Sequence, residues 1–373
     1  MARSQRHPNT LSRRALNRAL LARQMLLERV HRPAEDALEH LVGLQAQAPD
    51  APYFGLWSRL HEFDPSELAA LVQSRGAVRI ALMRSTIHLV TRRDCLRLRP
   101  AAQPMLERGF QSAYGRFLTG IDRERVVAEA RKILAERPLV SSELGRRLAQ
   151  RWRARNPSAL AYAARAWLPQ VQPPPRGVWG KSGPPVHVAA DGWIGDSIPR
   201  TAGPDDMVLR YLGAFGPATV ADTQQWSGLS RLAEVLERLR PRLVTFRDER
   251  GRELFDLPDA PRPDPDTAAP VRFVAPFDNL VLSHDDRTRV MSDEYRRWVS
   301  TLNGMIPGTV LVDGFVRATW SLRRQHRGAV VEVKPFGSLP RRVRADIAAE
   351  GDALLRFAVP EGQPRAYREF APV

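Results

Sequence analysis

The feature that most restricts how this chain can fold is a repeated order of predicted elements, in which helices are followed by a short β-hairpin. The order occurs first over residues 11–90, where apolar residues at helical spacing give way to a strand and tight turn at 78–90. It recurs over 123–194 and over 205–258. Helices followed by a hairpin are typical of winged-helix modules, and their recurrence predicts several modules in tandem.

This order divides the chain into four parts and predicts an α+β fold. Residues 1–120, 121–202 and 203–260 are expected to hold three winged-helix modules. The stretch 260–270 is rich in proline and aspartate and is interpreted as a linker. Residues 261–373 are expected to be mainly β, because strand-like alternation recurs there.

Local signals place individual elements within these parts. Ser12 is a plausible cap for the first helix, and Asp64 followed by Pro65 predicts the start of another. The hairpin strands are predicted at 171–180 and 186–194 in the second module and at 242–246 and 253–257 in the third.

The charge balance indicates a polyanionic partner. The chain has 57 lysines and arginines against 41 aspartates and glutamates, a formal net charge of +16, and its only lysines are Lys132, Lys181 and Lys334. A GC-rich genome explains arginine in place of lysine, but it does not explain the excess of positive charge. An excess of this size favours nucleic acid over a membrane surface as the partner.

Cysteine usage and hydropathy restrict the compartment. Cys95 is the only cysteine, which excludes an intramolecular disulfide and a cysteine-rich zinc site. The basic residues 1–6 are not followed by an apolar core, and no apolar run approaches the ~18 residues of a membrane span. We expect a cytoplasmic monomer without a membrane segment.

Two carboxamides, Gln45 and Gln47, lie where a helical pattern ends. Pro49 disfavours helical geometry in the residue before it, so the segment is expected to be extended. In an extended segment, side chains two residues apart point the same way. Two converging carboxamides can hold a water molecule, since each offers donors and an acceptor. Glutamines near turns are also ordinary surface residues, and the pair alone does not separate these interpretations.

A second group of interest is an arginine-rich stretch that contains Arg146, Arg147 and Arg151. Almost no carboxylate opposes these arginines in the sequence after Glu143. The stretch is interpreted either as a surface lying along DNA phosphates or as a solvated helix face. Phosphate contacts would make binding salt-dependent, with a log-log slope of about −0.9 per contact.

The stretch 276–289 mixes apolar residues with Asn279, His284, Arg287 and Arg289. One interpretation is a hairpin that enters the minor groove of DNA, with an apolar wedge between bases and arginine in the groove. Another is the end of a strand with a charged turn. The sequence keeps both open.

Other chemistries find little support. A metal site at His284, Asp285 and Asp286 is disfavoured, because adjacent residues rarely converge on one ion, so we expect no metal and no cofactor. The motifs GxGxxG, GxxxxGK[ST], GxSxG and HExxH are absent. His88 between Ile87 and Leu89 can be a catalytic base, but the interpretation as a hydrogen-bonded structural residue is favoured.

Five segments in order resemble the bacterial winged-helix DNA glycosylases of the AlkZ-like family. The likeness runs from about Leu11 to Phe357. The segments are Gly43–Gln47, Pro52–Trp57, Met83–Leu89, Arg176–Trp179 and Pro276–Leu280.

The resemblance implies a C-shaped protein in which tandem winged helices surround a basic channel for double-stranded DNA. Members of the family excise bulky alkylated purines, including N7-guanine adducts and interstrand crosslinks. Their catalytic Gln-aliphatic-Gln signature corresponds to Gln45, Ala46 and Gln47, and Gln47 matches the branch that unhooks crosslinks. The DNA-probing hairpin of the family corresponds to the region Asn279–Arg289.

The chemistry of such lesions agrees with a pair of neutral amides. An N7-alkylated guanine is already cationic, so no strong acid is needed, and Gln45 and Gln47 are expected to position water and to direct carbonyl dipoles toward the developing oxocarbenium charge. Without a nearby lysine, we expect a monofunctional glycosylase that leaves an abasic site. The DNA contacts are expected from Arg84, His88, Arg146, Arg147, Arg151, Asn279, His284, Arg287 and Arg289.

Two other functions fit the same features. A winged-helix transcription regulator shares the charge and the modules, although regulators usually pair two modules symmetrically. A protein that binds damaged DNA without cutting it is the third possibility.

Overall fold

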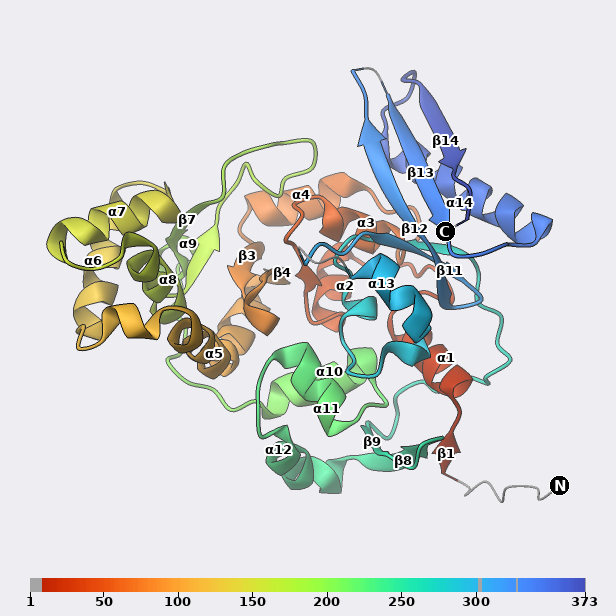
Figure 1. Ribbon diagram of the computed structural model, residues 1–373, viewed down its shortest axis with the longest axis horizontal. Coiled ribbons are helices and arrows are strands. Elements are labelled where there is room, and N and C mark those ends of the chain that lie inside the picture. Colours follow the sequence, from red (N-terminus) through yellow and green to blue (C-terminus); the bar gives the residue numbers. More distant parts are fainter. Residues whose placement is uncertain (1–8, 301–303, 327, 373) are drawn as a thin grey trace.

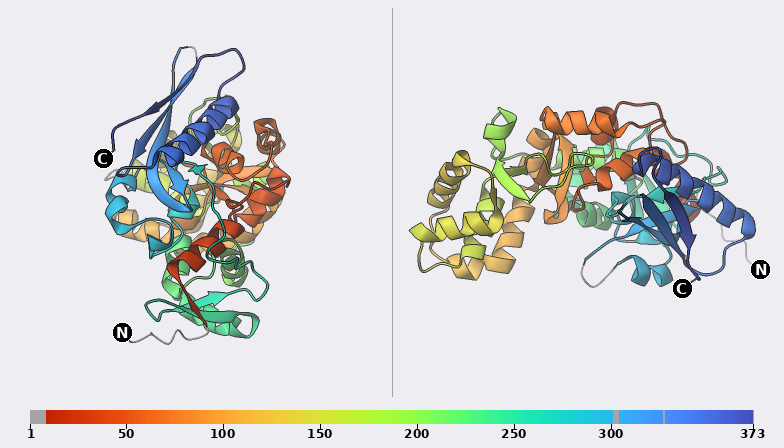
Figure 2. Two further views of the ribbon diagram at one scale, coloured as in Figure 1. Left: turned by 90° about the vertical axis from the view of Figure 1, so that its right-hand side faces the viewer. Right: turned by 90° about the horizontal axis from the view of Figure 1, so that it is seen from above.

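Helices and three separate β-sheets make up the computed structural model, which describes residues 9–300, 304–326 and 328–372 (Figure 1). The predicted α+β class is confirmed. In this part of the chain, no helix is long and apolar enough to cross a membrane. Figure 2 shows the helices α6–α8 and the C-terminal sheet at opposite ends of the molecule.

The N-terminal helices begin where the capping signals predict. The Ser12 side chain accepts a hydrogen bond from the Ala15 N–H at the start of the first helix, and Asp64 caps the fourth from the Ser66 N–H. These helices are α1 (Arg13–Arg23), α2 (Ala34–His40), α3 (Ala51–Trp57) and α4 (Pro65–Gln73).

A six-stranded sheet joins the first and second predicted modules. Its order is β2-β4-β3-β6-β7-β5. The junction is the antiparallel pair β3–β6, in which Arg79 lies opposite Gln172 and Ile80 opposite Val171. The strands are β2 (Leu44–Gln45), β3 (Ala77–Ala81), β4 (Ile87–Thr91), β5 (Leu139–Val140), β6 (Gln170–Gln172) and β7 (Val186–Ala189). The hairpin of the second module is therefore part of the sheet of the first.

Two strand predictions in this region were too long. The strand predicted over 171–180 ends at Gln172, because Pro173 and the two prolines after it have no N–H to donate to a neighbouring strand. The strand predicted over 186–194 ends at Ala189, where helix α9 (Ala190–Ile194) begins.

A helical group with its own apolar core packs against the sheet at strands β5 and β7. The core includes Phe110, Val126, Leu144 and Leu160, all buried. The group consists of α5 (Arg92–Tyr114), η2 (Gly115–Leu118), α6 (Arg123–Glu136), α7 (Ser141–Arg151) and α8 (Pro157–Trp167).

The third region contains the predicted hairpin. Strand β8 (Val244–Asp248) pairs antiparallel with β9 (Glu253–Asp256), and the distant N-terminal strand β1 (Thr10–Leu11) pairs parallel with β8. The helices before the hairpin are α10 (Asp205–Phe215), α11 (Val220–Ser227), α12 (Leu232–Leu239) and η3 (Arg240–Arg242).

The C-terminal part contains a five-stranded sheet, as its mainly β pattern predicts. Its strands are β10 (Arg272–Val274), β11 (Gly308–Val312), β12 (Phe315–Arg324), β13 (Ala329–Pro335) and β14 (Arg365–Glu369). Helix α14 (Arg341–Ala358) packs against β10, β13 and β14 (Figure 1).

The hairpin interpretation of 279–289 was wrong. This stretch lies between β10 and β11 and forms the short turns η4 (Asn279–Val281) and η5 (Arg287–Arg289), followed by η6 (Asp293–Tyr295) and α13 (Arg296–Val299). Leu280 and Val281 are each 1% exposed, so burial of the apolar residues turns the segment inward.

Candidate active site

The segment with the two glutamines leaves helix α2 through a tight turn. Gly43 has a φ of +83°, and a Cβ there would lie 2.5 Å from a methyl group of Val90, so only glycine allows β2 to lie against β4. Gln45 is then paired with His88 across the two strands. Opposed residues of adjacent strands share a face of the sheet, so Gln45 and His88 project to the same side.

Arg84 fixes the carboxamide of Gln45. Its Nη2 donates to Gln45 Oε1 at 2.9 Å and to Asn279 Oδ1 at 2.8 Å, and its Nη1 donates to the carbonyl of Trp226 at 2.7 Å. Burial and the neighbouring Arg287 lower the pKa of Arg84 to about 10, so it stays charged at neutral pH. Arg84 thus joins the first, third and C-terminal regions at one point, and both of its terminal nitrogens, Nη1 and Nη2, bind protein groups.

Gln47 reaches the same segment from the other end. The Ile87 N–H donates to Gln47 Oε1 at 3.4 Å, and the Gln47 side chain is exposed whereas Gln45 is 7% exposed. Since Arg84 has donors only, the oxygen of Gln45 must face it. Both glutamines are therefore anchored to residues 84–88 through their carbonyl oxygens. Among the residues that the structure describes, none accepts a hydrogen bond from their NH₂ groups, which can therefore donate to a ligand.

Asn279 adds a third amide to this cluster. It is 2% exposed, and its Nδ2 is buried without a hydrogen-bond partner among the residues that the structure describes. The preceding Asp278 accepts from the Leu280 N–H at 2.9 Å and binds Arg59 through both carboxylate oxygens, which fixes the turn that carries Asn279. The sequence placed Asn279 among DNA contacts, and the structure places it beside Gln45 and Arg84.

His88 is fully buried and neutral. Its Nδ1–H donates to the Thr86 carbonyl at 3.1 Å, whereas Nε2 has no partner within the described part of the chain. Burial and the charge of Arg84 lower the pKa of His88 to about 3. The hydrogen-bonded structural interpretation fits this position better than that of a base active near neutral pH.

Helix α7, which carries these arginines, lies at the edge of the molecule, away from strands β3 and β4 (Figure 1). The arginine-rich stretch itself has almost no opposing carboxylate after Glu143, but helix α6 supplies two from outside it. Arg147 pairs with Glu136 at 2.7 Å and Arg151 with Glu129 at 3.5 Å, whereas Arg146 is exposed. Only part of this positive charge is therefore available to a polyanion.

Two candidates of the 279–289 stretch are buried structural residues. His284 Nε2 donates to the Phe215 carbonyl at 3.0 Å, and Arg289 donates to the Pro217 carbonyl at 2.7 Å and to Asp222 at 3.3 Å. Arg287 is half-buried, lies close enough to lower the pKa of Arg84, and contacts Ser300 Oγ at 3.4 Å.

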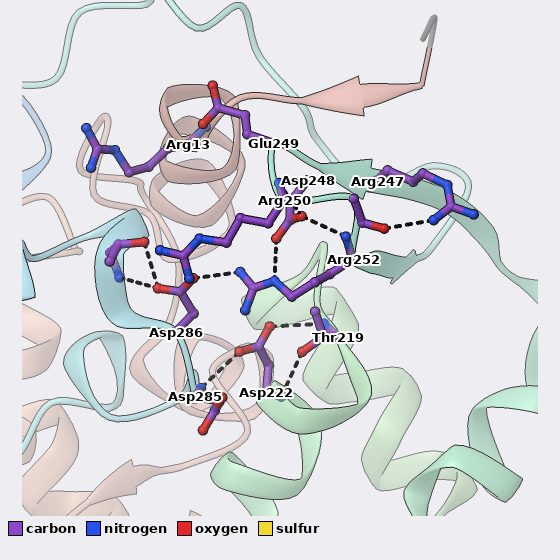
Figure 3. Close-up of polar contacts among 12 residues, drawn as sticks. Arg13, Thr219, Asp222, Arg247, Asp248, Glu249, Arg250, Arg252, Asp285 and Asp286 are labelled. Atoms are coloured by element: carbon purple, nitrogen blue, oxygen red, sulfur yellow. Dashed lines mark hydrogen bonds and ion pairs between the residues drawn. The ribbon is translucent and has the colours of Figure 1, made fainter. Parts of the chain in front are cut away.

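A polar network ties this stretch to the β8–β9 hairpin (Figure 3). Arg252 donates to Asp248 and to Asp286, each at 2.6 Å, and Arg250 donates to Asp286 at 3.1 Å. The network lines a cavity of about 270 Å³. Two arginines thus bind Asp286. Residues 9–300, 304–326 and 328–372 contain no group of three His, Cys, Asp or Glu residues arranged to hold a metal ion.

Three buried histidines make the fold sensitive to acid. Burial lowers the pKa of His88 to about 3 and that of His187 to about 4, and it also lowers the pKa of His284. The unfolded chain binds these protons below a pH of about 6.5, so the free energy of unfolding falls as pH drops from there toward 4. His187→Gln is expected to reduce the loss between pH 7 and 5 by about 2 kcal/mol. Urea titrations at both pH values measure it.

The control for this prediction is His61→Gln, because the side chain of His61 is 48% exposed. The control variant should lose as much stability between pH 7 and 5 as the unmodified protein. An equal loss in the His187 variant would contradict the assignment.

A basic α+β chain in which carboxamides lie where three regions meet suits a DNA glycosylase. The family model described as DNA glycosylase AlkZ-like matches residues 38–357. The chain belongs to the AlkZ-like DNA glycosylase family and is a DNA-repair enzyme whose substrate is DNA. This membership sets aside the regulator and the non-catalytic binder.

Two comparisons give the distance to known relatives. The chain is 25% identical over 341 residues to an interstrand DNA cross-link repair glycosylase of Streptomyces sahachiroi. The aligned residues cover 86% of this chain and 90% of that protein. The solved structure of the Streptomyces sahachiroi DNA glycosylase AlkZ matches with a TM-score of 0.75 at 23% identity, over 97% of this chain and 100% of that one. The structural likeness establishes the common fold.

Proposed function

We propose that this DNA glycosylase hydrolyses the N-glycosidic bond of bulky N7-alkylated purines in double-stranded DNA, including those of interstrand crosslinks. The observation that carries the proposal is the anchoring of Gln45 and Gln47 to the single segment 84–88. The crosslink part draws on the repair activity named for the Streptomyces sahachiroi relative.

The free NH₂ groups change the mechanism expected from the sequence. Arg84 donates to one lone pair of Gln45 Oε1, and its positive charge offsets the negative end of the carbonyl dipole. That dipole therefore contributes little to stabilising an oxocarbenium ion. The carboxamides can instead donate to the oxygen of one water molecule and to the acceptor atoms of the departing purine, which gains electron density as the bond breaks. The remaining lone pair of Gln45 Oε1 can accept a hydrogen bond from that water, and the proton released on hydrolysis passes to solvent.

The distribution of lysines favours a monofunctional enzyme. Lys132 lies in α6, Lys181 in the loop before β7 and Lys334 in β13, and none belongs to an element that carries a glutamine of the site. No Schiff base is expected to form, so the product is an intact abasic site.

The proposal also includes how DNA is bound, by a channel between the modules and by a hairpin that probes the duplex. We assign a winged helix to each of the three helix-and-hairpin regions, around a channel for DNA. Because 279–289 forms no hairpin and Asn279, His284 and Arg289 are buried, we assign the DNA-probing role to the β12–β13 hairpin. This hairpin projects from the molecule (Figure 1) and ends in Arg324, Gln325 and His326, all exposed.

The test uses duplex DNA with one defined N7-guanine adduct or one N7-linked crosslink. The protein is incubated with each duplex, and hot alkali then converts abasic sites to strand breaks. Release of the base with breaks only after alkali supports the proposal. If neither duplex breaks after alkali, the assignment to N7-alkylated purines is refuted. Strand breaks before alkali would indicate a lyase.

The rate of base release is expected to be nearly independent of pH between about 6 and 8. Carboxamides do not titrate in this range, and His88, with a pKa of about 3, remains neutral throughout. Single-turnover rates at half-unit pH intervals measure the profile. A bell-shaped profile would instead assign the chemistry to a carboxylate or a histidine.

A further inference from the structure

Arg79 is a buried cation in the middle of an apolar strand. It is 2% exposed and forms no ion pair with a carboxylate of the described residues, although the charge of Asp50 acts on it from a longer distance. Burial and the neighbouring Arg176 lower the pKa of Arg79 to about 10. An unpaired charge is costly to remove from water, so stability alone would favour an apolar residue at this position.

The guanidinium of Arg79 binds the peptide between the two glutamines. Its Nη2 donates to the Ala46 carbonyl at 2.8 Å and to Gln172 Oε1 at 3.3 Å. The Ala46 N–H in turn donates to the Ile87 carbonyl at 2.7 Å. Both backbone groups of Ala46 are therefore held, which sets the directions in which Gln45 and Gln47 leave the main chain.

Gly177 closes the pocket that holds Arg79. It has a φ of +86°, and a Cβ at this position would lie 2.5 Å from Arg79 Cδ. The Tyr53 hydroxyl donates to the Gly177 carbonyl at 2.8 Å and accepts from the Trp179 N–H at 3.0 Å, which fixes the loop over the arginine.

We infer that Arg79, held by Gly177, is a positioning residue that orients the Gln45–Ala46–Gln47 peptide from the opposite face of the sheet. Arg79 pairs with Leu89 whereas Gln45 pairs with His88, so their side chains lie on opposite faces. The inference rests on the proposed role of the two glutamines, and it gives the loop 176–179 a part in the reaction without contact with DNA.

The first test compares Arg79→Met with a matched control, Arg99→Met. Arg99 is 1% exposed and also donates to a glutamine, Gln103, and to a backbone carbonyl, that of Ala166, but it lies in α5. Arg79→Met is expected to lower the single-turnover rate of base release by about 10- to 100-fold, with the Kd for lesion-containing duplex unchanged within about two-fold. Arg99→Met is expected to change neither.

The second test perturbs Arg79 without replacing it. Gly177→Ala should push the arginine aside and slow base release. Gly180→Ala is the matched control, because Gly180 has a φ of +69° in the same loop and a Cβ there would meet nothing within 4 Å. Both variants carry the same kind of backbone strain, and only Gly177→Ala contacts Arg79.

The outcomes separate the inference from the function on which it rests. If the unmodified protein releases no base, the proposed function fails. If it is active, and Gln45→Ala is slow while the Arg79 and Gly177 variants match their controls, the positioning role alone is refuted. A rate loss matched by weaker DNA binding would also refute it, because that result indicates general disruption.

Discussion

Replacing Gln45 with alanine is expected to slow base release by about 100- to 1000-fold, the usual effect of removing one preorganised donor from a transition state. Affinity for lesion-containing duplex should change by less than about three-fold, because Gln45 is 7% exposed and offers little surface to DNA. Gln47→Ala is expected to slow base release by a similar factor. The measurements are single-turnover excision and equilibrium binding.

The control is Gln150→Ala, since Gln150 is exposed on α7, far from the site. Gln45→Glu separates the two ways in which a carboxamide can act. The glutamate keeps an oxygen for Arg84 but replaces the NH₂ donors with a second acceptor. If donation by NH₂ is what matters, the variant is as slow as alanine. An active glutamate variant would restore the carbonyl-dipole mechanism and contradict ours.

Asp278→Ala is expected to lower the free energy of unfolding by about 3 to 5 kcal/mol, the cost of leaving a buried charge without its partner. Arg59 Nη1 and Nη2 donate to the two oxygens of Asp278 at 2.8 and 2.9 Å, and the two side chains are 0% and 1% exposed. Asp278 also holds the turn that carries Asn279. Urea unfolding measures the loss.

The double variant Arg59→Met with Asp278→Ala tests the reason for this loss. Because it removes both charges, it should be more stable than Asp278→Ala alone. Arg344→Ala is the surface control, since Arg344 is 57% exposed in its pair with Glu369 and should cost less than about 1 kcal/mol. Additive losses in the double variant would show that the pair is not coupled.

Local sequence signals predicted the elements that depend on nearby residues. Ser12 and Asp64 cap the helices that follow them, and the strands around Asp248–Gly251 form the expected hairpin. The pairing of β3 with β6 joins residues about 90 positions apart, and no local pattern specifies such a partner. The same limit explains why the carboxylates of α6 were missed beside the arginines of α7.

The candidate site was predicted in part. Gln45 and Gln47 were found from their position before Pro49, whereas Asn279, His284 and Arg289 were expected at a surface that the fold buries. The sequence alone does not distinguish a polar residue that is buried with a distant polar partner from one that is exposed to solvent. The sequence contained one signal that Arg79 has a special role. It is the only charged residue in the apolar run Ala77–Ala81, and a charge buried in such a strand needs polar partners.

The backbone ladder between β3 and β6 has a mechanical consequence. The first two regions share main-chain hydrogen bonds, so the angle between them is built into one sheet and cannot open or close as a hinge without breaking that sheet. The first and third regions also share a short ladder, that of β1 with β8. Any clamping motion on a bound duplex must therefore arise at contacts outside these two ladders, such as the hydrogen bonds of the Arg84 side chain. The distortion needed to expose a damaged base then falls largely on the nucleic acid.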